Sequence, residues 1–185
     1  MNFVAISLRY AKALFLSAKE HNILEEVHQN LDLIKNTLKA NQDFLEVINN
    51  PVVKESKKIT IFQGIFGESI NQLTLDFLIL LVNKNRETSL LDIIRIFAKL
   101  YYEETNTKIV VVSTKVPINK ETEQSLENII KEKFNAKAEI ESIIDHNMIG
   151  GIKVRVDNLL LDLSVRNQLQ EIKKHLKKEV YKVKF

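Results

Sequence analysis

The sequence predicts an α+β protein in two parts: an N-terminal six-helix bundle over residues 1–105 and a small C-terminal α/β domain over residues 106–185. Only four glycines and two prolines occur among the 185 residues, which favours helices joined by short connections. Apolar residues recur at helical spacing up to about residue 105, and β-branched or alternating runs begin after Thr105-Asn106. The second domain is therefore expected to combine a short sheet with a terminal helix.

The first expected helix carries two neighbouring apolar stripes. The first stripe consists of Val4, Leu8, Ala11, Phe15 and Ala18, and the second consists of Tyr10, Ala13, Leu14 and Ser17. A helix at the surface of a small bundle needs only one apolar face. The second stripe therefore indicates either deep burial or a surface that binds a partner.

Helix start signals divide the rest of the bundle. They are capping-box pairs at Asn22 with Glu25 and at Ser69 with Gln72, the Asn50-Pro51 boundary, and Ser89 with Asp92 ahead of the last helix. A short helix is expected over residues 42–48. Because Pro suits the first turn of a helix, the next helix is expected directly after Asn50-Pro51 and should end near residues 64–67.

The run from Leu73 to Val82 is apolar on nearly all sides. Such a helix lies at the centre of a bundle or is covered by something outside the domain. The polar segment Asn83-Lys84-Asn85 is expected to end it.

The C-terminal part alternates between extended and helical patterns. Strand patterns cover residues 108–112, 136–142, 152–156 and 159–163. Asn119 is expected to cap a helix after the first strand, and Asp157-Asn158 to form a tight turn. Ser164 is expected to cap the final helix, whose apolar face holds Val165, Leu169, Ile172 and Leu176.

No catalytic, cofactor or metal site is expected. The absence of cysteine excludes disulfides, thiolate chemistry and cysteine-bound zinc. His21 and His28 are too far apart to share a metal. Asp162, Ser164 and His146 can be written as a triad, but a helix cap explains Ser164 better, since no nucleophile elbow accompanies it.

The paired glycines Gly150-Gly151 stand at a strand boundary. They lack the lysine and Ser/Thr of a phosphate loop and the third glycine of a dinucleotide fingerprint. A bulge or turn is therefore favoured, in which the backbone takes a geometry that a side chain would forbid or closely approaches another backbone.

No membrane span is expected, because the longest wholly apolar run, residues 77–82, is far too short to cross a bilayer. The N-terminus lacks the features of a secretory signal or a transit peptide, which favours a bacterial cytoplasmic protein attached to a membrane at most through partners. Between Val165 and Phe185 seven residues are basic and two are acidic. A solvated helix face is the favoured interpretation of this tail, and contact with phosphates or anionic lipid is the alternative.

Four stretches carry a family resemblance. They are Arg9-Tyr10-Ala11-Lys12-Ala13-Leu14-Phe15, Asn50-Pro51 with Lys57-Lys58 and Phe62/Phe66, Leu78 to Asn85 with Arg86, and Asp145 to Leu169 with its Asp-x-Ser-Val-Arg-x-Gln-Leu run. In order, spacing and total length they resemble the delta subunit of F-type ATP synthases, the oligomycin-sensitivity-conferral protein (OSCP) of mitochondria. Asp157 departs from the family, which often has glycine there, but Asp tolerates positive φ better than most residues.

The resemblance implies a non-catalytic stator subunit at the cytoplasmic face of the bacterial plasma (inner) membrane. The N-terminal bundle would bind the N-terminal segments of the alpha subunits of the catalytic head. The C-terminal domain would bind the C-terminal ends of the b subunits of the peripheral stalk. Torque and proton flow would then stay coupled to ATP synthesis. The resemblance implies no cofactor, nucleic acid or small-molecule substrate, and contact with the membrane only through the rest of the complex.

The resemblance implies two sets of candidate residues, one for binding the alpha subunits and one for the C-terminal fold or its contact with the stalk. The alpha-subunit groove, formed as in helix-in-groove recognition, would be lined by Tyr10, Ala13, Leu14, Ser17, Leu75, Ile79 and Val82. Simple bundle core is the alternative for each of these residues. Support of the C-terminal fold or its stalk contact is expected from Gly150, Gly151, Asp162, Ser164, Arg166 and Leu169. A generic adaptor or nucleic-acid-binding module remains the second functional interpretation.

Overall fold

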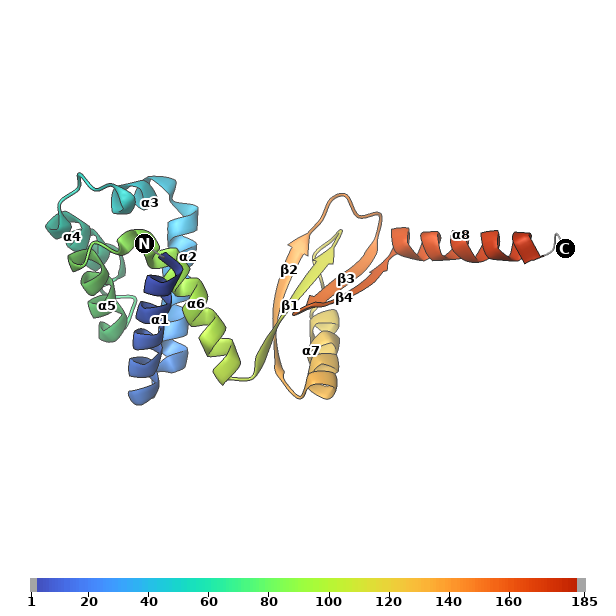
Figure 1. The fold of residues 1–185 in the computed structure, drawn as a ribbon, viewed down its shortest axis with the longest axis horizontal. Helices are drawn as coiled ribbons and strands as arrows, with labels where there is room; N and C mark the ends of the chain where they lie inside the picture. Colours follow the sequence, from blue (N-terminus) through green and yellow to red (C-terminus); the bar gives the residue numbers. More distant parts are fainter. Residues whose placement is uncertain (1–2, 183–185) are drawn as a thin grey trace. The chain divides into compact units, whose positions relative to one another are not determined.

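The computed structural model describes residues 3–182, with side chains from Ala5 to Lys174, and it divides the chain into two compact units, Met1–Glu103 and Glu104–Phe185 (Figure 1). Each unit is described by itself. The side chains of Val4, Leu176 and the lysines beyond Lys174 lie outside the described residues. Helices and a small mixed sheet confirm the α+β class.

The first unit consists of helices around one apolar core. In chain order these are α1 (Phe3–Glu20), α2 (Leu24–Ala40), α3 (Gln42–Asn49), α4 (Glu55–Phe66), α5 (Gln72–Asn83), the short 3-10 helix η1 (Glu87–Ser89) and α6 (Leu90–Glu104). All six α-helices in this described part contribute buried side chains to the core. Phe62, Phe66 and Phe97 are its largest fully buried members.

Three expected helix starts were wrong. Asn22 does not cap α2; it takes a left-handed conformation with φ of 57° in the turn between α1 and α2. Asn71 caps α5 in place of Ser69, and its side chain accepts a hydrogen bond from the backbone N–H of Thr74 at 2.8 Å. Pro51 stands in a loop before α4, which begins only at Glu55. Asn, Ser and Pro suit turns as well as caps, so spacing alone did not separate these uses.

The second unit is a four-stranded sheet with one helix on its face. Its elements are β1 (Thr107–Thr114), α7 (Lys120–Phe134), β2 (Lys137–Ile144), β3 (Gly151–Val156), β4 (Leu159–Ser164) and α8 (Val165–Lys182). The strand order is β2-β1-β3-β4, with β1 and β2 parallel and the other neighbours antiparallel. Ile130 of α7 packs with Val110, Val112, Val154 and Val156 of the central strands. The sheet edges in the described part are therefore β2 and β4.

The local signals of the second unit are largely confirmed. Asn119 caps α7 by accepting a hydrogen bond from the backbone N–H of Thr122 at 2.9 Å. Asp157 begins the β3–β4 turn with φ of 50°, and its Oδ2 accepts a hydrogen bond from Nζ of Lys108 at 2.8 Å. An aspartate thus occupies a left-handed position in this turn. Helix α8 follows β4 directly and projects from the end of the sheet (Figure 1).

Candidate functional site

No group of three or more His, Asp or Glu side chains among the described residues is arranged to hold a metal ion. Within the same range, no helix has the length and apolarity needed to cross a membrane.

The seven candidates on α1 and α5 separate into buried and accessible residues. Leu14, Leu75 and Val82 are buried, with exposed fractions of 3%, 8% and 0%. Tyr10, Ser17 and Ile79 are half-buried, and Ala13 is exposed. The buried three belong to the bundle's interior in this structure, so a partner could reach only the other four without rearrangement.

Tyr10 connects the two helices. Its ring meets the ring of Phe77 on α5 edge to face, with centroids 6.5 Å apart. Such pairs contribute about 0.5–1.5 kcal/mol beyond the burial of their area. The structure thus brings Tyr10 of α1 against α5 through Phe77, which was not itself a candidate.

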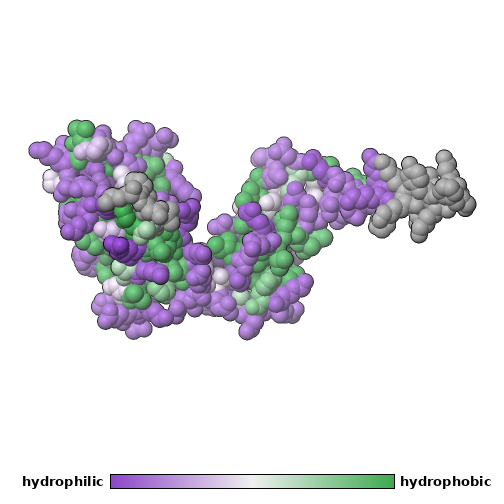
Figure 2. Space-filling model, viewed as in Figure 1, coloured by the Kyte–Doolittle hydropathy of each residue, from purple (hydrophilic) through white to green (hydrophobic). Residues whose placement is uncertain are grey.

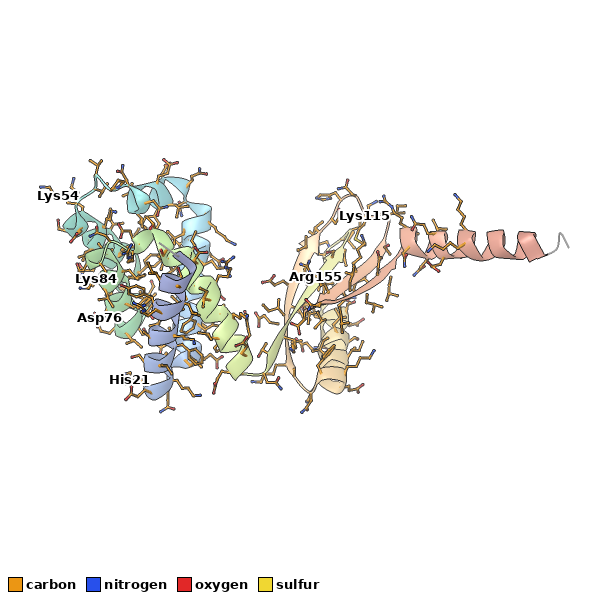
Figure 3. The ribbon with its side chains drawn as sticks, in the orientation of Figure 1. His21, Lys54, Asp76, Lys84, Lys115 and Arg155 are labelled. Atoms are coloured by element: carbon orange, nitrogen blue, oxygen red, sulfur yellow. The ribbon has the colours of Figure 1, made fainter. Side chains whose placement is uncertain are left out.

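Apolar side chains also reach solvent beside these candidates. Leu8 and Leu16 of α1 are 39% and 62% exposed, and Leu80 of α5 is 43% exposed. Leu8 of the first apolar stripe is therefore accessible, whereas Ala11, Phe15 and Ala18 of that stripe are buried. Asp76 lies on the exposed side of α5 (Figure 3), one turn before Leu80. Neighbouring apolar residues on two helices can bind the apolar face of a third helix.

Gly151 begins β3 where no side chain fits. Its φ is +83°, a region that L side chains rarely adopt. A Cβ at this position would lie 2.4 Å from the carbonyl oxygen of Leu163 and 2.9 Å from Cα of Ser164. Both expected reasons for a glycine, special geometry and close backbone approach, are confirmed at Gly151. At Gly150 a Cβ would meet only Cγ2 of Val165, at 3.4 Å.

Three side chains close the junction between β4 and α8. The backbone N–H of Ser164 donates to Oδ1 of Asp162 at 2.9 Å, and Nδ2 of Asn167 donates to the carbonyl oxygen of Asp162 at 3.0 Å. Oγ of Ser164 accepts from the backbone N–H of Asn167 at 3.3 Å, which confirms Ser164 as the cap of α8. Hydrogen bonds from the Ser164 side chain and backbone lower the pKa of Asp162 below its ordinary value.

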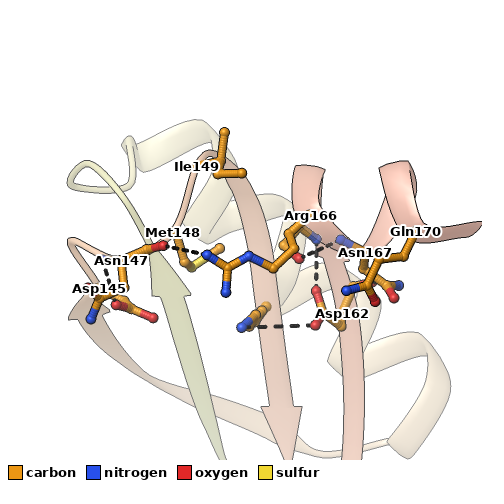
Figure 4. A pocket seen from close by; sticks show the side chains of 10 residues that line it. Asp145, Asn147, Met148, Ile149, Asp162, Arg166, Asn167 and Gln170 are labelled. Atoms are coloured by element: carbon orange, nitrogen blue, oxygen red, sulfur yellow. Dashed lines mark hydrogen bonds and ion pairs between the residues drawn. The ribbon is translucent and has the colours of Figure 1, made fainter. Parts of the chain in front are cut away.

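Arg166 extends the junction toward the loop before β3. Figure 4 shows its side chain crossing from the start of α8 to Asn147, whose carbonyl oxygen accepts a hydrogen bond from Nη2 at 3.4 Å. The same loop is fixed by Asp145, whose N–H donates to the carbonyl oxygen of Thr114 at 2.8 Å. The hollow among these residues has a volume of about 110 Å³, well below the roughly 300 Å³ of a small-molecule pocket. The cluster is therefore a joint that holds the base of α8.

The structure thus brings Gly150, Gly151, Asp162, Ser164 and Arg166 together at this joint. Leu169 is instead 55% exposed on α8, as is Ile172. Asn147 and Asn167, which complete the joint, were missed. Their only sequence signal is a polar side chain in a short loop and in the first turn of a helix.

Known proteins resemble the chain over nearly its whole length. The family model of the ATP synthase delta (OSCP) subunit matches residues 6–176. The chain belongs to the ATP synthase delta (OSCP) subunit family. This family is a structural, non-catalytic one.

Two relatives and one solved structure illustrate the likeness. ATP synthase subunit delta of Alkalihalophilus pseudofirmus is 32% identical over 177 residues, which cover 95% of this chain and 97% of the relative. The subunit delta of Clostridium botulinum strain Loch Maree is 33% identical over 170 residues, covering 92% and 95%. A chain in the cryo-EM structure of the Toxoplasma gondii mitochondrial ATP synthase hexamer shares the fold, with a TM-score of 0.71 at 23% identity over 92% of this chain and 96% of that one.

Proposed function

We propose that this delta (OSCP) family member links the catalytic head of an F-type ATP synthase to its peripheral stalk. The first unit binds N-terminal segments of the alpha subunits, and the second unit binds the C-terminal ends of the b subunits. The chain performs no chemistry. It keeps the head from turning with the central shaft, so that proton flow stays coupled to ATP synthesis at the cytoplasmic face of a bacterial membrane.

The observation that carries the proposal is the extent of the family match, which runs through both compact units. A linker needs two binding parts, and each unit has its own core. Each unit also carries exposed apolar residues, Leu16 and Leu80 in the first and Leu169 and Ile172 in the second. Apolar residues exposed together on one part of a surface are typical of partner-binding regions.

The alpha-subunit surface is proposed on α1 and α5. Ala13, Tyr10, Ser17 and Ile79 supply its accessible part, and Leu14, Leu75 and Val82 support it from the core. An amphipathic helix from the alpha subunit would bury Leu16 and Leu80 at the margins. Because these contacts are apolar, the affinity should depend little on salt, unlike binding to phosphates.

Calorimetric titration of the full chain with the N-terminal segment of the alpha subunit tests this surface, at low and high salt. We expect the alpha-subunit segment to bind the wild-type chain. Ala13→Glu and Ile79→Glu should each weaken this binding at least about tenfold, since each places a charge against an apolar face. Gln63→Glu on the exposed side of α4 adds the same charge elsewhere and should leave the affinity unchanged. Binding that falls steeply with salt, or that ignores both α1 and α5 variants, would contradict the proposal.

A further inference from the structure

One face of the sheet in the second unit is only half covered. The register places Leu159, Leu161 and Leu163 of β4 beside Val156, Val154 and Ile152 of β3, on the same face as α7. The β3 residues are buried or half-buried, but the three leucines are 62%, 55% and 45% exposed. Helix α7 therefore covers the central strands and leaves the β4 side open.

Helix α7 adds an apolar residue to the same opening. The parallel pair β1 and β2 is joined through α7, and such crossovers are right-handed in nearly all proteins. Ile130 is directed at the sheet, and successive residues of a helix are rotated by about 100°. In a right-handed crossover, the residue before Ile130 therefore lies on the side of α7 that faces β3 and β4, and this residue is Ile129. Ile129 is 46% exposed. We call Leu159, Leu161, Leu163 and Ile129 the β4 apolar surface.

The two edges of the sheet differ in a way that favours a partner on β4. Edge strands in soluble proteins are commonly protected by charged side chains. Strand β2 follows this rule, with exposed Lys137, Glu139 and Glu141. Strand β4 has Asp162 as its one charged residue, and that side chain is engaged at the α8 joint. The β4 edge thus lacks the protection that the β2 edge has.

We propose that the β4 apolar surface binds an amphipathic helix, which lies beside α7 and completes a layer of two helices on the sheet. Strand β4 and the neighbouring β3 are about 10 Å wide together, which matches the diameter of one helix. The leucines span about 13 Å along β4, or roughly nine residues of helix. Exposed Lys133 lies on the same flank of α7, so the helix should carry an acidic residue on the edge that faces α7.

Other occupants fit less well. An added β-strand would pair with the backbone edge of β4 but leave the leucine side chains uncovered, because they stand perpendicular to the sheet. Helix α8 cannot fold back over β4 without unwinding its first turn, since α8 begins at Val165 directly after Ser164. A second copy of the chain is an outcome that the test below separates.

The partner named here rests on the proposed function: the helix is the C-terminal end of a b subunit. The probe is therefore a soluble C-terminal fragment of the b subunit from the same organism, titrated into the full chain. We expect the fragment to bind the wild-type chain. Leu161→Glu should weaken this binding at least about tenfold, because the bound fragment buries Leu161. Leu160→Glu is the matched control. Leu160 is 65% exposed on the same strand but stands on the opposite face, so its variant should bind normally.

Amide hydrogen exchange on the same complex locates the fragment. Protection of β4 together with the Ile129 segment of α7, and loss of binding in Leu161→Glu alone, would support the proposal. Binding that survives Leu161→Glu, with protection confined to α8, would overturn the β4 apolar surface while leaving the b-subunit link intact. No binding by the folded wild-type chain would overturn both. A wild-type dimer in sedimentation that Leu161→Glu makes monomeric would assign the surface to a second copy instead.

Discussion

Gly151 stands so close to Leu163 across the β3–β4 pair that a Cβ would lie 2.4 Å from the Leu163 carbonyl oxygen. The same residue has φ of +83°. The backbone of β3 therefore passes directly beside the end of β4, at the point where α8 begins. This contact sets the geometry of the joint between β4 and α8.

Replacing Gly151 by alanine should destabilise the second unit by at least about 2 kcal/mol, because the left-handed conformation and the backbone clash add together. Gly150→Ala should change stability by less than about 1 kcal/mol, since its Cβ would meet only the end of the Val165 side chain. Chemical denaturation followed by residue-resolved amide signals separates the units. Equal effects of the two substitutions would contradict this account of Gly151.

The charged form of Asp162 should stabilise the second unit. Its folded pKa is lowered by hydrogen bonds from Ser164, so the stabilisation is present above its ordinary pKa of 3.8 and is lost as the pH falls through the lower folded value. Asp162→Asn should abolish this acid-dependent part of the free energy of unfolding. Denaturation of both proteins between about pH 5 and about pH 2.5 measures it. Parallel stability curves for the two proteins would show that the Ser164 hydrogen bonds do not favour the carboxylate.

Ser164 should matter mainly to the first turn of α8. Ser164→Ala removes the hydroxyl that accepts from the Asn167 N–H, and loss of a helix cap costs about 1 kcal/mol. The amides of the first α8 turn should then exchange faster with solvent, while those of α1 to α6 stay unchanged. Unaltered exchange in that turn would mean that Asp162 and Asn167 hold the helix without the cap.

Lys58 and Glu87 form a buried ion pair between α4 and η1, with side chains 3% and 8% exposed. Replacing Glu87 alone by leucine leaves the Lys58 ammonium buried without its partner, which should cost about 3–5 kcal/mol. The double variant Lys58→Met with Glu87→Leu should recover most of that loss, because no charge is then left buried. Urea unfolding of the wild type, the two single variants (Lys58→Met and Glu87→Leu) and the double variant gives the coupling free energy between Lys58 and Glu87. Additive losses would show that the pair does not act as a unit.

Sequence patterns predicted the course of the chain better than its exposed surfaces. Gly151, Asn119 and the Asp157 turn followed from local backbone rules, because each acts on residues close in sequence. The caps at Asn22 and Ser69 were wrong because asparagine and serine favour turns and helix starts alike.

Burial depended on contacts that a sequence pattern does not contain. Residues 159–163 were correctly expected to form a strand, but only the strand order puts that strand at an edge beyond the reach of α7. Leu14 and Ile79 stood together as groove candidates, yet packing buries the first and leaves the second half-exposed. Separating the buried candidates from the accessible ones therefore required the packed structure.

Simultaneous binding of both partners tests the linker most directly. The alpha-subunit N-terminal segment is immobilised, the full chain is captured on it, and the C-terminal b fragment is then passed over the surface. The account predicts that the b fragment adds to the captured chain with the affinity it shows for the free chain, since the two partners use separate units. Release of the chain by the b fragment, or no addition at all, would contradict a stator role.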